Sequence, residues 1–384
     1  MRIALVIERM QPSRGGRERS VGEIAAALSA RGHEVAVYCQ QAPQKPEGMA
    51  VRVLGGEGSS AGMVNFARAV IRTARQEGID IVHAALPIPG ADVYQPRGGT
   101  ILGNLAAKRL RRPVIAAVQG LALNLGWSRR GTALALERSC IANPATLCLG
   151  VSQKVVDEIG ALYGRRENLR LVHNGVAVPE VSDDQRRLWR KEWRDRWQAG
   201  EATTVFLTVA QNFKLKGVEQ TIAAFGQIAR ANDCRLVIVG RQSGQGRYQQ
   251  QALETCPPGS VIFEPPQEDV FGLYSAADAV VLLSWYDACS RVVLEALRWG
   301  LPSLTTRLNG AAEFLADGAG IVIDTPSDIA AASEGMTRLC DPQARQAMSQ
   351  ACQAASAYAS IDRQVDQLLE LYENIMRDRA GGAG

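Results

Sequence analysis

Short apolar segments alternate with amphipathic helical segments along almost the whole chain, and this alternation limits the fold more than any other feature. Each apolar segment has the length of a strand, and the residues that follow it repeat at helical spacing. Strands that alternate with helices form βαβ units and parallel sheets. The expected strands lie at 2–8, 35–40, 51–54, 79–85, 145–151, 169–173, 204–210, 235–239, 261–264, 279–284, 302–306 and 320–323.

Glycines mark the ends of some of the expected helices. Helix 17–31 is followed by Gly32 and helix 290–299 by Gly300, and glycine is the residue that most often follows a helix. The other expected helices lie at 62–76, 152–162, 218–231 and 362–378.

The 384 residues and the two groups of strands predict an α/β protein of two doubly wound, Rossmann-like domains facing a central cleft. A segment of linker composition follows Asn174-Gly175-Val176, which places the domains at 1–178 and 179–360. Residues 361–384 are expected to form a C-terminal helix that packs back on the N-terminal domain and ends in a frayed tail. Ligands of such folds bind at the carboxyl ends of the strands.

The composition excludes several classes of protein. The net charge is +4, from 43 basic and 39 acidic residues, which is too small to predict nucleic-acid binding. Apolar runs such as 279–283 are far shorter than the ~20 residues that span a bilayer, and residues 1–8 do not resemble a signal peptide. Eight scattered cysteines without a CxxC pair predict no zinc site and fit a reducing compartment. We therefore expect a cytoplasmic protein, and peripheral attachment to the inner face of the cell membrane stays open.

A glycine pair, Gly15-Gly16, stands between the first strand and the first helix. Glycines before a helix let the backbone approach a ligand and point free N–H groups at it. The spacing is not GxGxxG and no acidic residue ends strand 35–40, so a dinucleotide site and a dehydrogenase are disfavoured. A plain turn between strand and helix is the alternative.

The second half carries a more specific set of residues, on the loops that follow strands 204–210 and 279–284. Lys216 lies on the first loop, whereas Asp287 lies on the second and Glu295 eight residues later inside a helix. The amide groups near Ser290–Val292 begin that helix and carry a partial positive charge. A diphosphate bound there gains Lys216 as counter-charge, while the two acids accept hydrogen bonds from sugar and ribose hydroxyls. Each acid alone is more often a surface group or a helix cap.

These residues resemble the pattern of glycosyltransferase family 4, the retaining enzymes with the two-domain GT-B fold. The family has Glu-x7-Glu followed by Ala, a small residue, Gly and Pro, and this chain has Asp287-x7-Glu295 followed by Gly300 and Pro302. The likeness continues through 305–313, 174–176, Gly15-Gly16 and Lys216-Gly217. Pro89-Gly90-Ala91-Asp92-Val93-Tyr94 and Phe213 are most similar to the members that add glucose to the lipopolysaccharide inner core.

The resemblance implies which residues are catalytic and which bind the donor or the acceptor. The catalytic candidates are Asp287, Lys216, Glu295 and Asp92, and for Asp92 a structural cap is an equal alternative. The donor-binding candidates are Gly15, Gly16, Gln211, Lys214, Lys216, Arg241, Ser290, Arg291, Val292 and Glu295. The acceptor-binding candidates are His83, Arg97 and His173. The family works without a divalent metal, so neither a metal nor a cofactor is expected.

Three positions depart from the family pattern. Asp287 is one methylene shorter than the usual glutamate, and Gln211 stands where many members have a diphosphate-binding arginine, a role left to Lys214 or Arg291. Arg97 replaces a histidine, which removes one candidate base.

The resemblance implies the transfer of a hexose, glucose from a UDP-sugar, to a saccharide or lipid-linked acceptor such as lipopolysaccharide core or another cell-surface glycan. The N-terminal domain is then the acceptor-binding domain and the C-terminal domain holds the nucleotide-sugar. A nucleotide-sugar epimerase and a non-catalytic nucleotide-sugar-binding homologue are the alternatives.

Two surfaces are candidates for contact with an anionic membrane. Basic residues lie beside apolar ones and a tryptophan between 105 and 130, although a solvated helix face explains them equally well. Trp189, Trp193 and Trp197 share one face of a helix at a spacing of four residues. We expect this second set to pack on the C-terminal domain, with membrane or acceptor contact as the alternative.

Overall fold

The computed structural model describes residues 1–11, 15–43, 46, 48–55, 59–111, 129–241 and 244–381. The chain divides into two compact units. The N-terminal unit contains Met1–Gly175 and Ile361–Gly384, and the C-terminal unit contains Val176–Ser360. The division after Gly175 lies three residues before the expected one at 178. The chain enters and leaves the C-terminal unit at neighbouring points, because Val176 and Ser360 form a parallel β-bridge.

The N-terminal unit is built on a parallel sheet of seven strands in the order β3-β2-β1-β4-β5-β6-β7. The strands are β1 (Arg2–Arg9), β2 (Glu34–Gln41), β3 (Ala50–Val53), β4 (Ile81–Ala84), β5 (Val93–Tyr94), β6 (Leu147–Gly150) and β7 (Leu169–Leu171). Six of them match expected strands. The sequence reasoning missed β5, since two residues in a segment rich in proline and glycine give no strand period, and only pairing with β4 and β6 makes them a strand.

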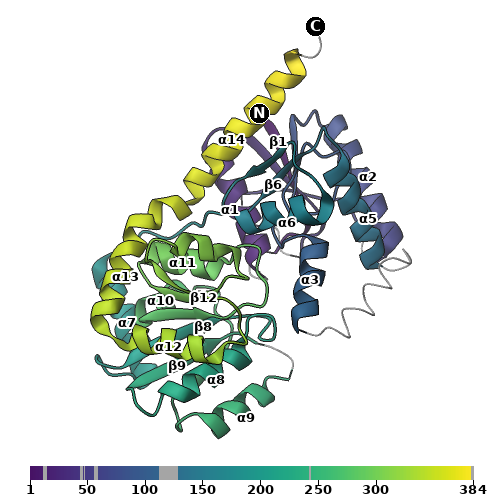
Figure 1. Ribbon diagram of the computed structural model, residues 1–384. Helices are drawn as coiled ribbons and strands as arrows, with labels where there is room; N and C mark the ends of the chain where they lie inside the picture. The colour runs from purple at the N-terminus through teal and green to yellow at the C-terminus, as the bar shows by residue number, and fades with distance from the viewer. Residues whose placement is uncertain are drawn as a thin grey trace. The chain divides into compact units, whose positions relative to one another are not determined.

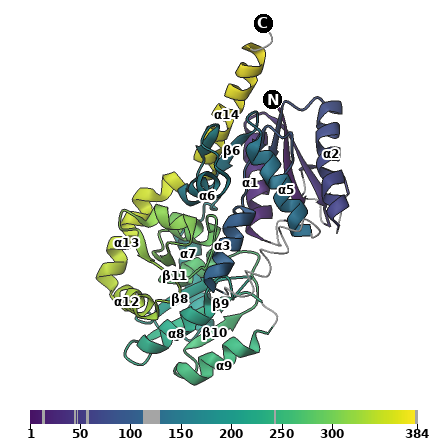
Figure 2. The same ribbon diagram turned by 45° about the vertical axis from the view of Figure 1, so that its right-hand side comes forward.

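Helices cover the sheet of the N-terminal unit. They are α1 (Gly16–Ala30), α2 (Ser60–Gln76), α3 (Ile101–Arg111), α5 (Arg129–Ala142), α6 (Gln153–Tyr163) and α14 (Ile361–Gly381). Helix α1 contacts α14, and α2 contacts α5 (Figure 1 and Figure 2). Arg31 after α1 pairs with Asp362 and Asp366 of α14, both at 3.0 Å, so charged groups as well as apolar packing hold α14 to this unit.

The C-terminal unit has a parallel sheet of six strands in the order β10-β9-β8-β11-β12-β13. The strands are β8 (Thr204–Val209), β9 (Cys234–Val239), β10 (Val261–Glu264), β11 (Ala279–Leu282), β12 (Ser303–Thr306) and β13 (Gly320–Ile323). All six match expected strands, and the central strands β8, β11 and β12 are buried along almost their whole length, as strands covered on both faces are. Together the two sheets confirm the predicted fold class of two doubly wound, Rossmann-like α/β domains.

Two apolar cores lie on opposite faces of this sheet. One packs against α8 (Val218–Ile228), α9 (Gly246–Thr255) and α12 (Ile329–Cys340). The other packs against α7 (Asp183–Arg196), α10 (Phe271–Ala276) and α11 (Arg291–Trp299). The remaining helices are η2 (Gly310–Leu315), α13 (Pro342–Ala355) and η3 (Ser356–Ala359).

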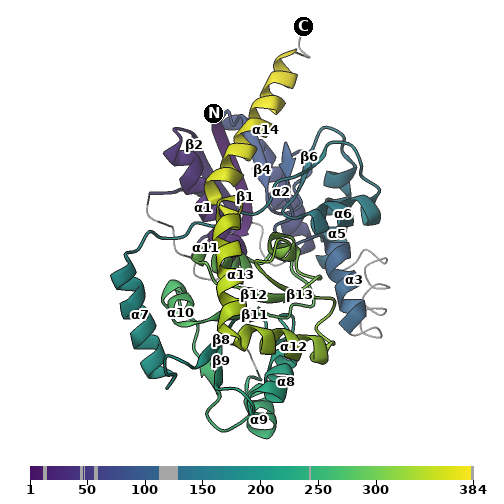
Figure 3. The same cartoon turned by 60° about the vertical axis from the view of Figure 1, so that its left-hand side comes forward.

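The three tryptophans on or beside α7 belong to the second of these cores. Trp197 is 1% exposed and donates its indole N–H to Glu264 at 3.1 Å, and Trp193 packs on Trp197 with ring centroids 5.4 Å apart. Helix α7 lies beside α10, as Figure 3 shows. The packing interpretation is therefore confirmed, since Trp197 is buried in this core and Trp189 and Trp193, both half-buried, pack against it.

No helix within the described residues has the length and apolar character that crossing a membrane requires.

Candidate active site

In the C-terminal unit, the strand order reverses direction between β8 and β11. The chain runs outward from β8 through β9 to β10, and then returns to β11 on the other side of β8. Open parallel sheets bind ligands at the carboxyl ends of the strands where this reversal occurs. The two loops that leave this position are 210–217 after β8 and 283–290 after β11, and they carry Lys216 and Asp287.

Gly217 lets these two loops meet. It has φ of +67°, and a Cβ atom built there would overlap the backbone carbonyl of Leu283. Only glycine combines this backbone conformation with so close an approach. The Trp285 amide also donates to the Leu215 carbonyl at 2.9 Å, which fastens the second loop to the first.

As a result, Lys216 and Asp287 form an ion pair between Nζ and Oδ2. Their side chains are 21% and 17% exposed, so the pair is half-buried and remains accessible. The backbone of Asp287 is held on its other side, since its amide donates to Leu308 at 3.1 Å and its carbonyl accepts from Gly310 at 3.0 Å. Two of the predicted catalytic residues are thus brought together at the carboxyl edge of the sheet.

Helix α11 begins beside this pair, with Ser290 as its N-cap residue. The Ser290 side chain makes no cap hydrogen bond to this helix, and the first turn of an α-helix carries a partial positive charge. The Ser290 amide itself is occupied, because it donates to Asn309 Oδ1 at 3.1 Å. Ser290 is therefore not a phosphate ligand through its amide in this conformation, and the predicted amide cluster begins at the first turn of the helix.

Asn309 is a residue to which the sequence reasoning gave no role. Its carboxamide oxygen also accepts the Ala311 amide at 3.1 Å, and its nitrogen donates to Thr305 Oγ1 at 3.0 Å. One buried side chain therefore ties the α11 start to the loop after β12. Residues 305–313 contribute to the family resemblance, but their sequence does not indicate that Asn309 contacts the start of α11.

Glu295 is more enclosed than the sequence indicates. It is 4% exposed, and its carboxylate accepts from Arg291 Nη2 at 2.9 Å and from the Tyr274 hydroxyl at 3.0 Å. Arg291 is 8% exposed, so it is a buried residue and not a surface arginine. Nothing in the sequence spacing pointed to Tyr274, which comes from α10.

The other donor-binding candidates of this unit lie along the same carboxyl edge. Gln211 and Lys214 belong to the loop after β8, where Gln211 is exposed and Lys214 is half-buried. Arg241 is exposed and follows β9, the neighbour of β8 in the sheet. All three thus follow β8 or β9 at the edge that carries the Lys216–Asp287 pair, and their roles stay predictions.

In the N-terminal unit the matching reversal of strand order lies between β1 and β4. Gly15 is the N-cap of α1 and Gly16 its first residue, so the glycine pair does open a helix there. Residues 12–14 of the same loop lie outside the described residues. The approach of a donor phosphate to this helix start stays a prediction.

Arg97 is buried within the N-terminal unit at 6% exposure. Its guanidinium donates to Gln95 Oε1 at 2.7 Å and to the side chains of Ser20 and Asn174. It therefore joins the loops after β5 and β7 to α1. His173, one residue before Asn174, is half-buried, and its carbonyl accepts from Arg363 at 2.9 Å.

The other two candidates of this unit are not placed for chemistry. His83 is 4% exposed and packs under α14, where Nδ1 lies 2.5 Å from the Tyr372 hydroxyl. Burial, together with the nearby Arg97 charge, lowers the pKa of His83 to about 3, so the imidazole is neutral. An acceptor-binding role for His83 is contradicted, because the helix covers it.

Asp92 precedes β5 and so lies at the amino edge of the sheet, opposite the edge where ligands bind. Its carboxylate accepts the Val82 amide at 2.7 Å and pairs with Arg379 of α14. This placement contradicts a catalytic Asp92 and supports the alternative of a structural cap.

The basic segment between 105 and 130 is only partly described, since residues 112–128 lie outside the described residues. The described residues contain no group of three or more histidine, cysteine or acidic side chains arranged to hold a metal ion.

Two protein families match consecutive segments of this chain. Residues 14–178 match the family described as Glycosyltransferase Family 4, and residues 190–355 match the family described as Glycosyl transferases group 1. The chain belongs to these glycosyltransferases. It is therefore an enzyme of the GT-B type, as the two parallel-sheet units indicate.

Named relatives of this glycosyltransferase share most of its length. The lipopolysaccharide glucosyltransferase WaaG of Escherichia coli K12 is 26% identical over 81% of this chain and 82% of its own. A D-inositol 3-phosphate glycosyltransferase of Corynebacterium jeikeium is 26% identical over 98% and 97% of the two chains.

Solved structures show the same fold. The crystal structure of WaaG aligns with a TM-score of 0.78 at 21% identity, over 96% of this chain and 99% of the other. Anabaena HepE in complex with UDP-glucose aligns with a TM-score of 0.70 at 19% identity, over 96% and 99%.

Proposed function

We propose that this glycosyltransferase transfers glucose from UDP-glucose, with retention, to a saccharide or lipid-linked acceptor such as lipopolysaccharide core. The name of WaaG and the UDP-glucose complex of HepE support this choice of sugar and nucleotide. The observation that carries the proposal is the Lys216–Asp287 pair, which lies at the strand reversal of the C-terminal unit beside the start of α11.

Lys216 is suited to the donor diphosphate. An ammonium has three N–H groups, and Asp287 accepts one of them, which leaves two for phosphate oxygens. The first turn of α11 adds a partial positive charge from the same side. Charge that is already in place stabilises the departing nucleoside diphosphate without reorganisation, and such stabilisation is commonly the largest part of catalysis.

We assign the two carboxylates, Asp287 and Glu295, to different parts of the donor. Asp287 is accessible and is held by the loops after β8 and β12, so we assign it the hydroxyls of the transferred sugar. Glu295 accepts two hydrogen bonds, and a carboxylate has about four lone-pair sites, which leaves capacity for ribose hydroxyls. Because Glu295 is buried, its second task is to orient Arg291 at the helix start.

We further propose that Lys216 and the α11 start supply the positive charge that a divalent metal supplies in other transferases. The enzyme is then expected to keep its full rate in EDTA and to gain nothing from added Mg²⁺ or Mn²⁺. A rate that falls to background in EDTA and returns with one of these ions would reject this part of the proposal.

The donor is tested by thermal melting and by hydrolysis with UDP-, GDP- and ADP-glucose and with UDP-galactose. A donor that binds the native state raises the melting temperature by mass action, so no acceptor is needed. We expect UDP-glucose to protect and to be hydrolysed slowly, and Lys216→Ala to abolish both effects. Epimerised product without an acceptor would identify an epimerase, whereas protection by UDP without turnover of any sugar would identify a non-catalytic homologue.

A further inference from the structure

A cavity of about 500 Å³ opens on the N-terminal unit beside α2. Its walls are apolar residues of α2, the loop after β4 and α5, namely Val64, Ala67, Ile71, Pro89 and Leu136. This volume falls within the range of natural small-molecule sites. None of the residues that line this cavity belongs to the proposed donor site.

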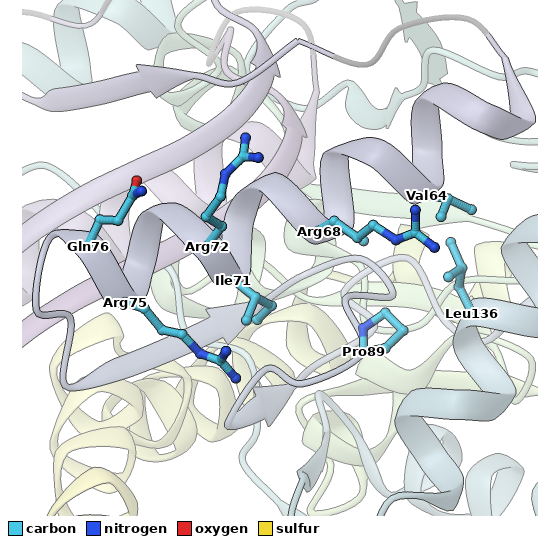
Figure 4. Close-up of a pocket in the computed structure, with 9 residues that line it drawn as sticks. Val64, Arg68, Ile71, Arg72, Arg75, Gln76, Pro89 and Leu136 are labelled. Atoms are coloured by element: carbon cyan, nitrogen blue, oxygen red, sulfur yellow. The ribbon is translucent and has the colours of Figure 1, made fainter.

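Three arginines stand around this apolar cavity. Arg68, Arg72 and Arg75 are spaced by four and three residues, so they follow one face of α2. Figure 4 shows Arg68 and Arg75 on either side of Ile71, with Arg68 beside Leu136. All three side chains are exposed, and none has an ion-pair or hydrogen-bond partner within the described part of the chain.

The charge of this surface is not balanced by its neighbours. Helix α2 has no acidic residue, and the one acid of α5, Glu137, is 1% exposed and accepts the hydroxyls of Tyr94 and Tyr163. Glu77, the residue after α2, accepts from Tyr38 and Arg52. Arg138 adds another exposed cation on α5.

We propose that the cavity and its arginines form a docking site for an anionic phospholipid of a bilayer, with an acyl chain against Ile71 and Leu136 and the phosphate on the guanidinium groups. Arginine matches phosphate through paired N–H donors. An amphipathic helix binds at a membrane interface when basic side chains without acidic partners lie beside apolar ones. A sugar or a free phosphate satisfies only the arginines and leaves the apolar walls uncovered.

The proposal is tested with the full chain and vesicles of phosphatidylcholine with or without phosphatidylglycerol, by co-sedimentation. We expect binding only to the anionic vesicles. The variant Arg68→Gln/Arg72→Gln/Arg75→Gln is expected to bind on the order of a hundredfold more weakly, from the contribution that each charge makes near an anionic surface. Ile71→Gln, which keeps the charge, is expected to weaken binding as well.

A matched control removes three other exposed arginines, in Arg166→Gln/Arg230→Gln/Arg338→Gln. This control has the same net charge as the first variant and is expected to bind as the parent does. Equal losses in both triple variants would mean that total charge alone drives binding, which overturns the site. Anionic vesicles that fail to bind the parent, or that bind the α2 variant unchanged, overturn it too.

Two further measurements locate the lipid and identify its source. A phosphatidylglycerol with a photoreactive acyl chain is expected to label peptides that contain residues 64–76 or Leu136, and labelling confined to other peptides contradicts the proposal. Millimolar glycerol 3-phosphate is expected to leave vesicle binding intact, whereas full displacement by it would show a site for free phosphate. Unchanged melting temperatures of all variants confirm that the losses do not come from unfolding.

Discussion

Gly217 and Leu283 approach so closely that a single methyl group on Gly217 would overlap the Leu283 carbonyl. This contact brings the loop after β8 against the loop after β11, and it sets the position of the neighbouring Lys216 opposite Asp287.

We expect Gly217→Ala to lower the free energy of unfolding by roughly 2–4 kcal/mol, because the added Cβ meets both a left-handed backbone and a carbonyl. Donor turnover should fall with it as Lys216 moves. Gly259→Ala is the control, since Gly259 has φ of +74° with nothing within 4 Å of an added Cβ. Denaturant titration of both variants separates the two effects, and equal losses would show that the Leu283 contact is unimportant.

Lys216→Ala is expected to lower kcat/KM for glucose transfer on the order of 10²–10³-fold, because it removes charge that is in place for the leaving diphosphate. The half-buried lysine should have a small effect on folding. Lys191→Ala removes an exposed lysine paired with Asp195 and should leave the rate unchanged. Initial rates with UDP-glucose decide the matter, and a fully active Lys216→Ala enzyme refutes the site.

Arg291 and Glu295 form a buried pair, so removal of one partner leaves a buried charge without compensation. We expect Arg291→Met to destabilise the protein by about 3–5 kcal/mol. The double variant Arg291→Met/Glu295→Gln should recover much of this loss, since no charge is then left behind. Denaturant titrations of the two single variants and the double variant form a cycle, and strict additivity would contradict the coupling of the pair.

The neutral, buried His83 predicts a pH dependence of stability. Its pKa is about 3 in the folded chain and about 6.5 when unfolded, so the unfolded state binds the proton more tightly. The His83 contribution is therefore present above about pH 6.5 and is lost progressively as the pH falls towards about 3. His83→Gln should make the free energy of unfolding less dependent on pH in this window, as melting curves between pH 4 and 7 can show. An unchanged slope would mean that the imidazole is not shielded from protonation.

The sequence predicted most strands and helices because each carries its own period of apolar residues. The predicted α11, 290–299, differs by one residue from Arg291–Trp299, and its end at Gly300 has the expected left-handed conformation. Strand β5 was missed because its two residues owe their structure to their neighbours. Such an element leaves no periodic signal in the chain.

The candidate site was predictable in part for the same reason. Lys216 and Asp287 follow neighbouring strands, so parallel topology alone brings them to one edge. Glu295 contacts Tyr274 of the preceding helix α10, and His83 contacts Tyr372 of α14, which is 289 residues away. The period of apolar residues within one element does not report such contacts between elements. Asp92 resembled a functional residue by its motif, yet the direction of β5 puts it at the opposite edge.

The bridge between Val176 and Ser360 makes the C-terminal unit an insertion into the N-terminal one, with its entry and exit side by side. Paired strands lie about 4.8 Å apart, so a linker of a few residues suffices to rejoin the chain after excision of 176–360. Genetic exchange of that whole segment between relatives thus requires only two adjacent junctions, and it leaves α14 attached to the sheet on which it packs.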